Sequence, residues 1–118
     1  MEDNDVYRES LELLLGLEDG LEIVGSVGDG TDAAGACARS RADVVLMDFR
    51  LPGLDGAAAT AAVRGECPGA AVVCLTAEAT AEDRDAVLAA GAVGLVEKSR
   101  PVEELVATIR QAAGREPA

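Results

Sequence analysis

Short apolar runs alternate with longer stretches of helical spacing along almost the whole chain. The runs are rich in Val, Leu and Ala, and they lie at residues 21–27, 44–47, 71–75 and 93–96. Runs of this kind between turn residues are typical of strands that are buried on both faces of a parallel sheet. Because parallel neighbours need a crossover, usually a helix, the alternation predicts an α/β fold with helices on both faces of the sheet.

The stretches between the runs have the spacing of amphipathic helices. We expect helices at residues 5–17, 32–40, 57–65 and 81–90, and a last helix that begins at Pro101. The first predicted helix carries an apolar stripe that consists of Tyr7, Leu11, Leu14 and Leu15, widened by Leu13 and Leu17. The last predicted helix has the i, i+3, i+4, i+7 pattern of a face that packs on a core, at Val102, Leu105, Val106 and Ile109.

The composition sets the size and the chemistry of the core. A chain of 118 residues, 49% of them hydrophobic, suits one domain with one core. We expect this domain to span residues 1–113, with residues 114–118 as a tail or the start of a linker. With one Phe, one Tyr and no Trp, the core is built from Leu, Val and Ala, and the composition argues against stacking on nucleic-acid bases.

The charged and sulfur-containing residues exclude several further functions. A net charge of −12 opposes direct binding of nucleic acid by this chain. The chain has no His, so histidine catalysis and histidine metal ligands are excluded. Its cysteines, Cys37, Cys67 and Cys74, have the spacing of neither a zinc site nor a disulfide framework. No apolar run has the length of a membrane span or a signal peptide, so we expect a cytoplasmic protein without membrane contact.

The second apolar run ends in a carboxylate. Asp48 follows the run at 44–47 directly, and a turn rich in Pro, Gly and Asp comes shortly afterwards at 52–56. In open α/β sheets, functional sites form at the carboxyl ends of the strands. Asp48 is therefore a candidate site residue, although an Asp in such a place also occurs simply as a cap of the following loop.

Other polar side chains follow the neighbouring runs. Thr76 comes directly after the third run, and Lys98, the only lysine, closely follows the fourth. Glu2 and Asp3 precede the first predicted helix. Each of these has an ordinary alternative as a helix cap, a surface charge or a charged terminus. Because the carboxyl ends of parallel strands lie at one edge of the sheet, we expect all of them to converge on Asp48.

Such a set of side chains indicates phosphoryl chemistry with a metal ion. Carboxylates gathered in one place repel one another unless a cation joins them, and an oxygen-rich set suits Mg²⁺. A carboxylate is also a nucleophile toward phosphorus and then forms an aspartyl phosphate. Lys98 would neutralise the phosphoryl oxygens, and Thr76 would donate a hydrogen bond to one of them.

Taken in order and spacing, these motifs resemble the receiver domains of two-component response regulators. The resemblance covers residues 2 to about 113 and is strongest to the subfamily with a C-terminal helix-turn-helix. The matching motifs are Glu2-Asp3 with Arg8, Leu46-Met47-Asp48, Pro52-Gly53-Leu54-Asp55-Gly56, Leu75-Thr76-Ala77, Ala89-Ala90-Gly91-Ala92-Val93-Gly94, and Lys98. The resemblance implies a flavodoxin-like three-layer α/β/α fold with the strand order 2-1-3-4-5.

The resemblance also implies how the phosphoryl group is received. Asp48 would accept it from the phosphohistidine of a sensor histidine kinase. Glu2, Asp3, Asp48 and the backbone carbonyl of Arg50 would hold Mg²⁺. The chain would then be a phosphorylation-dependent signalling switch in transcription regulation, and not an enzyme that turns over a substrate.

The same resemblance implies how the signal leaves the site. Thr76 and Lys98 would contact the phosphoryl group and pull on the loops that follow their strands. We expect this to change the surface formed by residues 81–113, where a partner or a second copy of the chain would bind.

The sequence departs from the family pattern in three places. The first strand of the family, which would precede Glu2, is absent from the sequence. We expect an upstream start, while sliding of the 21–27 strand beside 44–47, or strand exchange with another chain, are the other outcomes. Asn4 stands where the subfamily often has His. Leu95 stands where the family usually has an aromatic residue that moves inward on phosphorylation.

Two other functions stay open at this point. The first is a degenerate receiver that acts as a protein-interaction module without phosphorylation, which the absent strand and Leu95 favour. The second is a small phosphatase with an aspartyl nucleophile. Such enzymes commonly place a second Asp two residues after the nucleophile, and this chain has Arg50 there.

Overall fold

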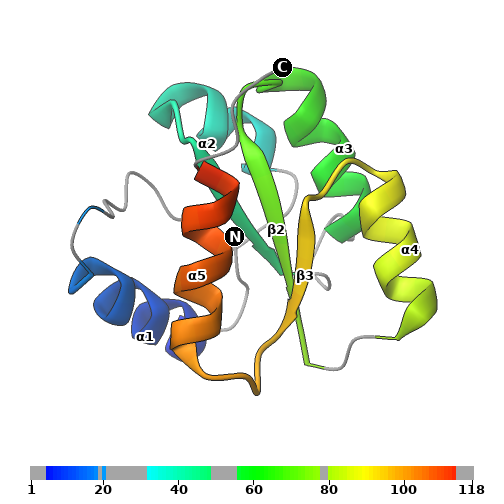
Figure 1. Ribbon diagram of the computed structural model, residues 1–118. Coiled ribbons are helices and arrows are strands. Elements are labelled where there is room, and N and C mark those ends of the chain that lie inside the picture. The colour runs from blue at the N-terminus through cyan, green and yellow to red at the C-terminus, as the bar shows by residue number, and fades with distance from the viewer. Residues whose placement is uncertain (1–4, 19, 21–31, 49–55, 78–79, 114–118) are drawn as a thin grey trace.

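A computed structural model describes residues 5–18, 20, 32–48, 56–77 and 80–113 (Figure 1). From residue 32 onward, helices and strands alternate in the described residues as the sequence predicts. The helices are α1 (Asp5–Gly16), α2 (Ala33–Ser40), α3 (Gly56–Glu66), α4 (Ala81–Ala89) and α5 (Val102–Ala113), and the strands are β1 (Val44–Asp48), β2 (Ala71–Thr76) and β3 (Gly94–Glu97). The predicted strand at 21–27 lies outside the described residues. The last helix begins at Val102, one residue later than predicted.

The described strands form one parallel sheet in the order β1-β2-β3. In the register of the sheet, Asp48 at the end of β1 lies beside Leu75 of β2. Thr76 at the end of β2 lies beside Glu97 at the end of β3. The three strands therefore end almost level, and the residues at and just after their ends share one edge of the sheet.

Helices cover both faces of the sheet, as Figure 1 shows. Because successive side chains of a strand point to opposite faces, β2 contributes to two separate cores. On one face, Val73 and Leu75 pack with residues of α1 and α5. On the other face, Val72 and Cys74 pack with residues of α2, α3 and α4. The fold is the expected flavodoxin-like α/β arrangement, and the order of the described strands agrees with the last three strands of that topology.

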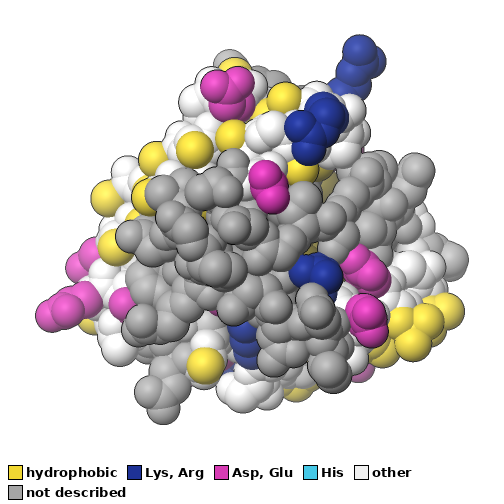
Figure 2. Space-filling view, turned by 180° about the vertical axis from the view of Figure 1, so that it is seen from behind, with side chains coloured by type: hydrophobic (Ala, Val, Ile, Leu, Met, Phe, Trp, Pro, Cys, Tyr) yellow, Lys and Arg dark blue, Asp and Glu magenta, His cyan; other side chains and the backbone are white. Residues whose placement is uncertain are grey.

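Only part of the apolar stripe of α1 is buried. Leu15 is buried in the core, and Tyr7 and Leu11 pack against it. Leu13 and Leu17, which widen the stripe in the sequence, are 68% and 74% exposed. The view from behind shows an apolar patch at the side of the molecule where α1 lies (Figure 2). The buried face of α1 is therefore narrower than its apolar composition suggests.

The three cysteines are free thiols. Burial, together with the neighbouring Cys67 thiol that shares a hydrogen bond with it, raises the pKa of Cys37 to about 12. Burial also raises the pKa of Cys74, whose sulfur lies 3.4 Å from the Thr60 hydroxyl. Both buried cysteines are therefore protonated and weakly nucleophilic at neutral pH.

We expect the three cysteines of the folded protein to react with a thiol reagent at very different rates. Cys67 is only half-buried, so at pH 8 it should react first, while Cys37 and Cys74 should react only as the protein opens. Mass spectrometry of the alkylated protein measures this, and all three thiols should react in denaturant. A Cys67→Ser variant should lack the fast thiol. Equally fast labelling of Cys37 in the native protein would contradict the burial described here.

Candidate functional site

Asp48 is a buried carboxylate at the carboxyl edge of the sheet. It is the last residue of β1, and its side chain is only 6% exposed. Val45 and Met47 of the same strand are buried in the core beneath α2 and α3, and this packing places Asp48 at the edge of the sheet. An ionised carboxylate in such a place is costly unless a cation or hydrogen-bond donors compensate it.

Lys98 supplies the compensating charge. Its ammonium nitrogen donates a hydrogen bond to Asp48 Oδ2 over 3.0 Å, and its side chain is 23% exposed. The backbone N–H of Lys98 donates to the carbonyl of Thr76 over 2.7 Å, so the chain is still attached to β2 as it leaves β3. This bond fixes the base of the lysine side chain, and the ammonium reaches across β2 to β1.

Thr76 lies between these two residues in the sheet. It is the last residue of β2 and is buried. In the register, Thr76 is one residue beyond the partner of Asp48 and is itself the partner of Glu97, which precedes Lys98. The ends of three neighbouring strands thus bring together a carboxylate, a hydroxyl and an ammonium group.

The remaining predicted ligands lie outside the described residues. These are Glu2, Asp3 and Arg50. In the part of the chain that the structure describes, no three His, Cys, Asp or Glu side chains are grouped closely enough to hold a metal ion. The described part of the site therefore contributes one predicted metal ligand, Asp48, whose carboxylate oxygens suit a hard cation such as Mg²⁺.

Tyr7 is a residue of the site that the sequence did not indicate. The Lys98 ammonium lies 4.8 Å from the centre of the Tyr7 ring, within the range of a cation–π interaction. In the sequence, Tyr7 fits the apolar stripe of a helix, and nothing in its spacing relates it to a lysine at the other end of the chain. The only signal was composition, because Tyr7 is the single tyrosine.

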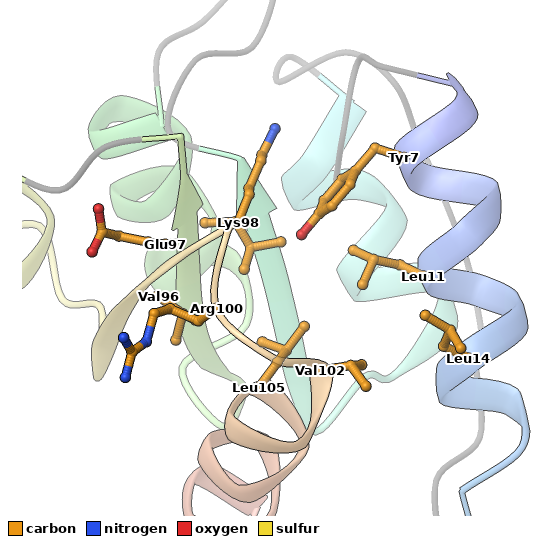
Figure 3. Close-up of a pocket in the computed structure, with 10 residues that line it drawn as sticks. Tyr7, Leu11, Leu14, Val96, Glu97, Lys98, Arg100, Val102 and Leu105 are labelled. Carbon is orange, nitrogen blue, oxygen red and sulfur yellow. The ribbon is translucent and has the colours of Figure 1, made fainter.

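A pocket of about 220 Å³ lies beside the ion pair, between α1, β3 and α5. Its walls are mostly apolar, and Figure 3 shows Tyr7, Leu11 and Leu14 reaching into this space from α1. Val102 and Leu105 face them from α5. Lys98 is at the rim, so the same side chain contacts both the buried carboxylate and the pocket.

The arrangement is suited to a reaction in which anionic charge develops at Asp48. Functional sites of open α/β sheets form at the carboxyl edge, where the carboxylate of Asp48 lies. An ammonium group held at hydrogen-bond distance neutralises further negative charge placed there. The neighbouring strand ends in Thr76, whose hydroxyl is a further hydrogen-bond donor at the same edge of the sheet.

The sequence matches the response regulator receiver domain over residues 1–110. This chain belongs to the receiver domain family of response regulators. It is similar to the transcriptional regulatory protein TcrX of Mycobacterium tuberculosis, with 38% identity over 110 residues that make up 93% of this chain and 46% of TcrX. It is also similar to the nitrate/nitrite response regulator protein NarP of Escherichia coli, with 32% identity over 96% of this chain and 53% of NarP.

Solved structures of receiver domains have the same fold. The signal receiver domain of NarL from Mycobacterium tuberculosis superposes with a TM-score of 0.88 at 32% identity, covering 97% of this chain and 93% of that one. A DNA-binding response regulator of the LuxR family from Staphylococcus aureus gives a TM-score of 0.88 at 26% identity, covering 96% of this chain and 94% of that one. The chain spans about half the length of the curated relatives it matches.

Among the described residues, no helix of this receiver has both the length and the apolar character needed to cross a membrane. The longest of them, α1 and α5, have 12 residues each and carry charged side chains.

We expect the Asp48–Lys98 pair to show strong energetic coupling in a double-mutant cycle. Lys98→Met leaves the buried carboxylate without its cation, which costs about 3 kcal/mol in the free energy of unfolding. Asp48→Asn should cost less, because the partly exposed ammonium can turn to water. The double variant should lose less than the sum, with a coupling of about 1–3 kcal/mol measured by urea denaturation.

The exposed pair of Arg110 and Glu18, with nitrogen and oxygen 3.5 Å apart, serves as the control cycle. Its coupling should be well below that of the buried pair. Additive losses at Asp48 and Lys98 would show that the contact contributes nothing to the folded state.

Proposed function

We propose that this receiver domain is a phosphorylation-dependent signalling switch in which Asp48 accepts the phosphoryl group. The observation that carries the proposal is the 3.0 Å contact between the Lys98 ammonium and the buried Asp48 carboxylate. The only lysine of the chain thus reaches a carboxylate whose side chain is 6% exposed. The membership of the receiver family supports the same assignment.

The transfer is a displacement at phosphorus. An oxygen of Asp48 attacks the phosphorus of a phosphohistidine on a sensor histidine kinase. The new O–P bond forms as the P–N bond breaks, and the bonding electron pair stays on the histidine nitrogen, which takes up a proton. Lys98 then neutralises charge on the phosphoryl oxygens, and the Thr76 hydroxyl donates a hydrogen bond to one of them.

The proposal includes Mg²⁺ because the assigned ligands are all oxygen donors, which this ion prefers. We assign Glu2, Asp3, Asp48 and the backbone carbonyl of Arg50 as the residues that hold it, a set made only of oxygen atoms. Bound there, the ion would neutralise negative charge on the acceptor carboxylate and on the incoming phosphoryl group.

The output surface is the second part of the proposal. We assign it to residues 81–113, which include α4, β3 and α5, because Lys98 connects β3 to the phosphoryl site. Binding of a partner, or of a second copy of the chain, at this surface would depend on phosphorylation. The receiver unit of this proposal spans residues 1–113, followed by a tail at 114–118.

Incubation with Mg²⁺ and acetyl phosphate should add the mass of one phosphoryl group to the intact protein. Asp48→Asn should abolish the addition, and so should chelation of the metal with EDTA. Asp43→Asn is the matched control, because Asp43 is an exposed carboxylate at the start of the same strand region and should leave the addition unchanged.

Sedimentation of the same samples should show whether phosphorylation changes self-association.

Addition of a phosphoryl group to the Asp48→Asn variant would refute the assignment of the acceptor. Failure of the wild-type protein to gain the mass would favour a receiver that acts only as an interaction module.

A further inference from the structure

The Lys98 ammonium contacts two groups that belong to different parts of the fold. On one side it donates to Asp48 Oδ2 over 3.0 Å. On the other side it lies 4.8 Å from the centre of the Tyr7 ring, which belongs to α1. Figure 3 shows the ring of Tyr7, which extends from α1, beside the Lys98 side chain. The Lys98 ammonium therefore connects the carboxylate of β1 with α1.

Leu95 is not placed to transmit a change at Asp48. Its side chain is 7% exposed and packs in the core under α2, α3 and α4, on the opposite face from α1. It has no π system to interact with an ammonium group. Tyr7 is the only aromatic residue among those that the structure describes, and it contacts the ammonium directly.

The ring of Tyr7 has room to move. It lines the pocket of about 220 Å³ between α1 and α5. It also packs against the core cluster that includes Leu105 of α5. A displaced ring would enter a space whose walls are mostly apolar, with Leu11 on the same helix and Val102 on α5. A change in the position of the ring therefore acts on the packing of α1 against α5.

We propose that Tyr7 is a positioning residue that passes the phosphorylation state of Asp48 to α1 through Lys98. The inference rests on the proposed function, in which Asp48 carries the phosphoryl group. A phosphoryl group adds negative charge and acceptor oxygens, and a charge-assisted hydrogen bond to it is stronger than a cation–π contact at a partly exposed site. Phosphorylation thus draws the ammonium away from the ring, and the ring repacks in the pocket between α1 and α5.

Tyrosine fluorescence reads this step directly, because the protein has one Tyr and no Trp. During treatment with Mg²⁺ and acetyl phosphate, the emission of Tyr7 should shift in intensity with the same time course as the gain of phosphoryl mass in the intact protein. Asp48→Asn should show neither change. Lys98→Met, which removes the cation from the ring, should already emit near the phosphorylated level before the donor is added.

Two results of this experiment have different meanings. Gain of the phosphoryl mass with constant Tyr7 emission would overturn the inference and leave the proposed function intact. Absence of any mass gain would overturn the proposed function, and the inference with it.

Hydrogen exchange of α1 tests whether the ring itself carries the effect. In the wild type, and in Tyr7→Phe, which keeps the π face, phosphorylation should change the exchange of the α1 amides. Tyr7→Leu keeps an apolar side chain but has no π face, so it should gain the phosphoryl mass while the change in α1 is lost. Melting temperatures of the variants show that each is folded. An equal change of α1 in Tyr7→Leu would overturn the role of Tyr7.

Discussion

The contact between Lys98 and Asp48 is the interaction on which the rest of the site depends. A carboxylate that is 6% exposed needs a cation or several donors near it, and the only lysine of the chain fills this need. The lysine can reach because β1, β2 and β3 end level and because its own backbone N–H is bound to Thr76. The ammonium group of Lys98 therefore compensates the charge of the buried Asp48 carboxylate and also contacts α1 through Tyr7.

On one face, the sheet that holds this contact packs on a core of aliphatic and sulfur-containing side chains. The core beneath α2, α3 and α4 consists of Ala, Val, Cys, Met and Leu side chains, so short helices can lie close to the strands. Thr60 of α3 is fully buried, and its hydroxyl lies near the Cys74 sulfur. The strands are packed on both faces. The preceding residue, Met47, is fully buried, and Asp48 pairs with Leu75 of β2, so the position of Asp48 is fixed.

Much of the fold follows from local patterns in the sequence. The apolar runs at 44–47, 71–75 and 93–96 are strands within one or two residues, because a short run between turn residues is a strong signal. The burial of α1 was harder to foresee. Leu13, Leu14 and Leu17 are all apolar, yet they are exposed, since the width of the buried face depends on where the helix sits on the sheet.

The candidate site could also be predicted from the sequence only in part. The apolar runs indicate where each strand ends, and the ends of parallel strands lie at one edge of the sheet. The sequence alone therefore suggests that Thr76 and Lys98 lie near Asp48. The contact of Lys98 with Tyr7 depends on the path of two long side chains from different elements, and no local pattern encodes such a path. Glu2, Asp3 and Arg50 lie outside the described residues, and their assignment as metal ligands stays a prediction.

The side-chain nitrogen of Lys98 offers the most direct measurement of the central contact. Because the protein has a single lysine, labelling with ¹⁵N-lysine gives one ammonium signal in the NMR spectrum. We predict a slowly exchanging signal whose chemical shift moves when Asp48 is changed to Asn, since the hydrogen-bonded carboxylate is then lost. An ammonium signal with the shift and exchange rate of free lysine, identical in the wild type and in Asp48→Asn, would show that Lys98 does not bind Asp48 in solution.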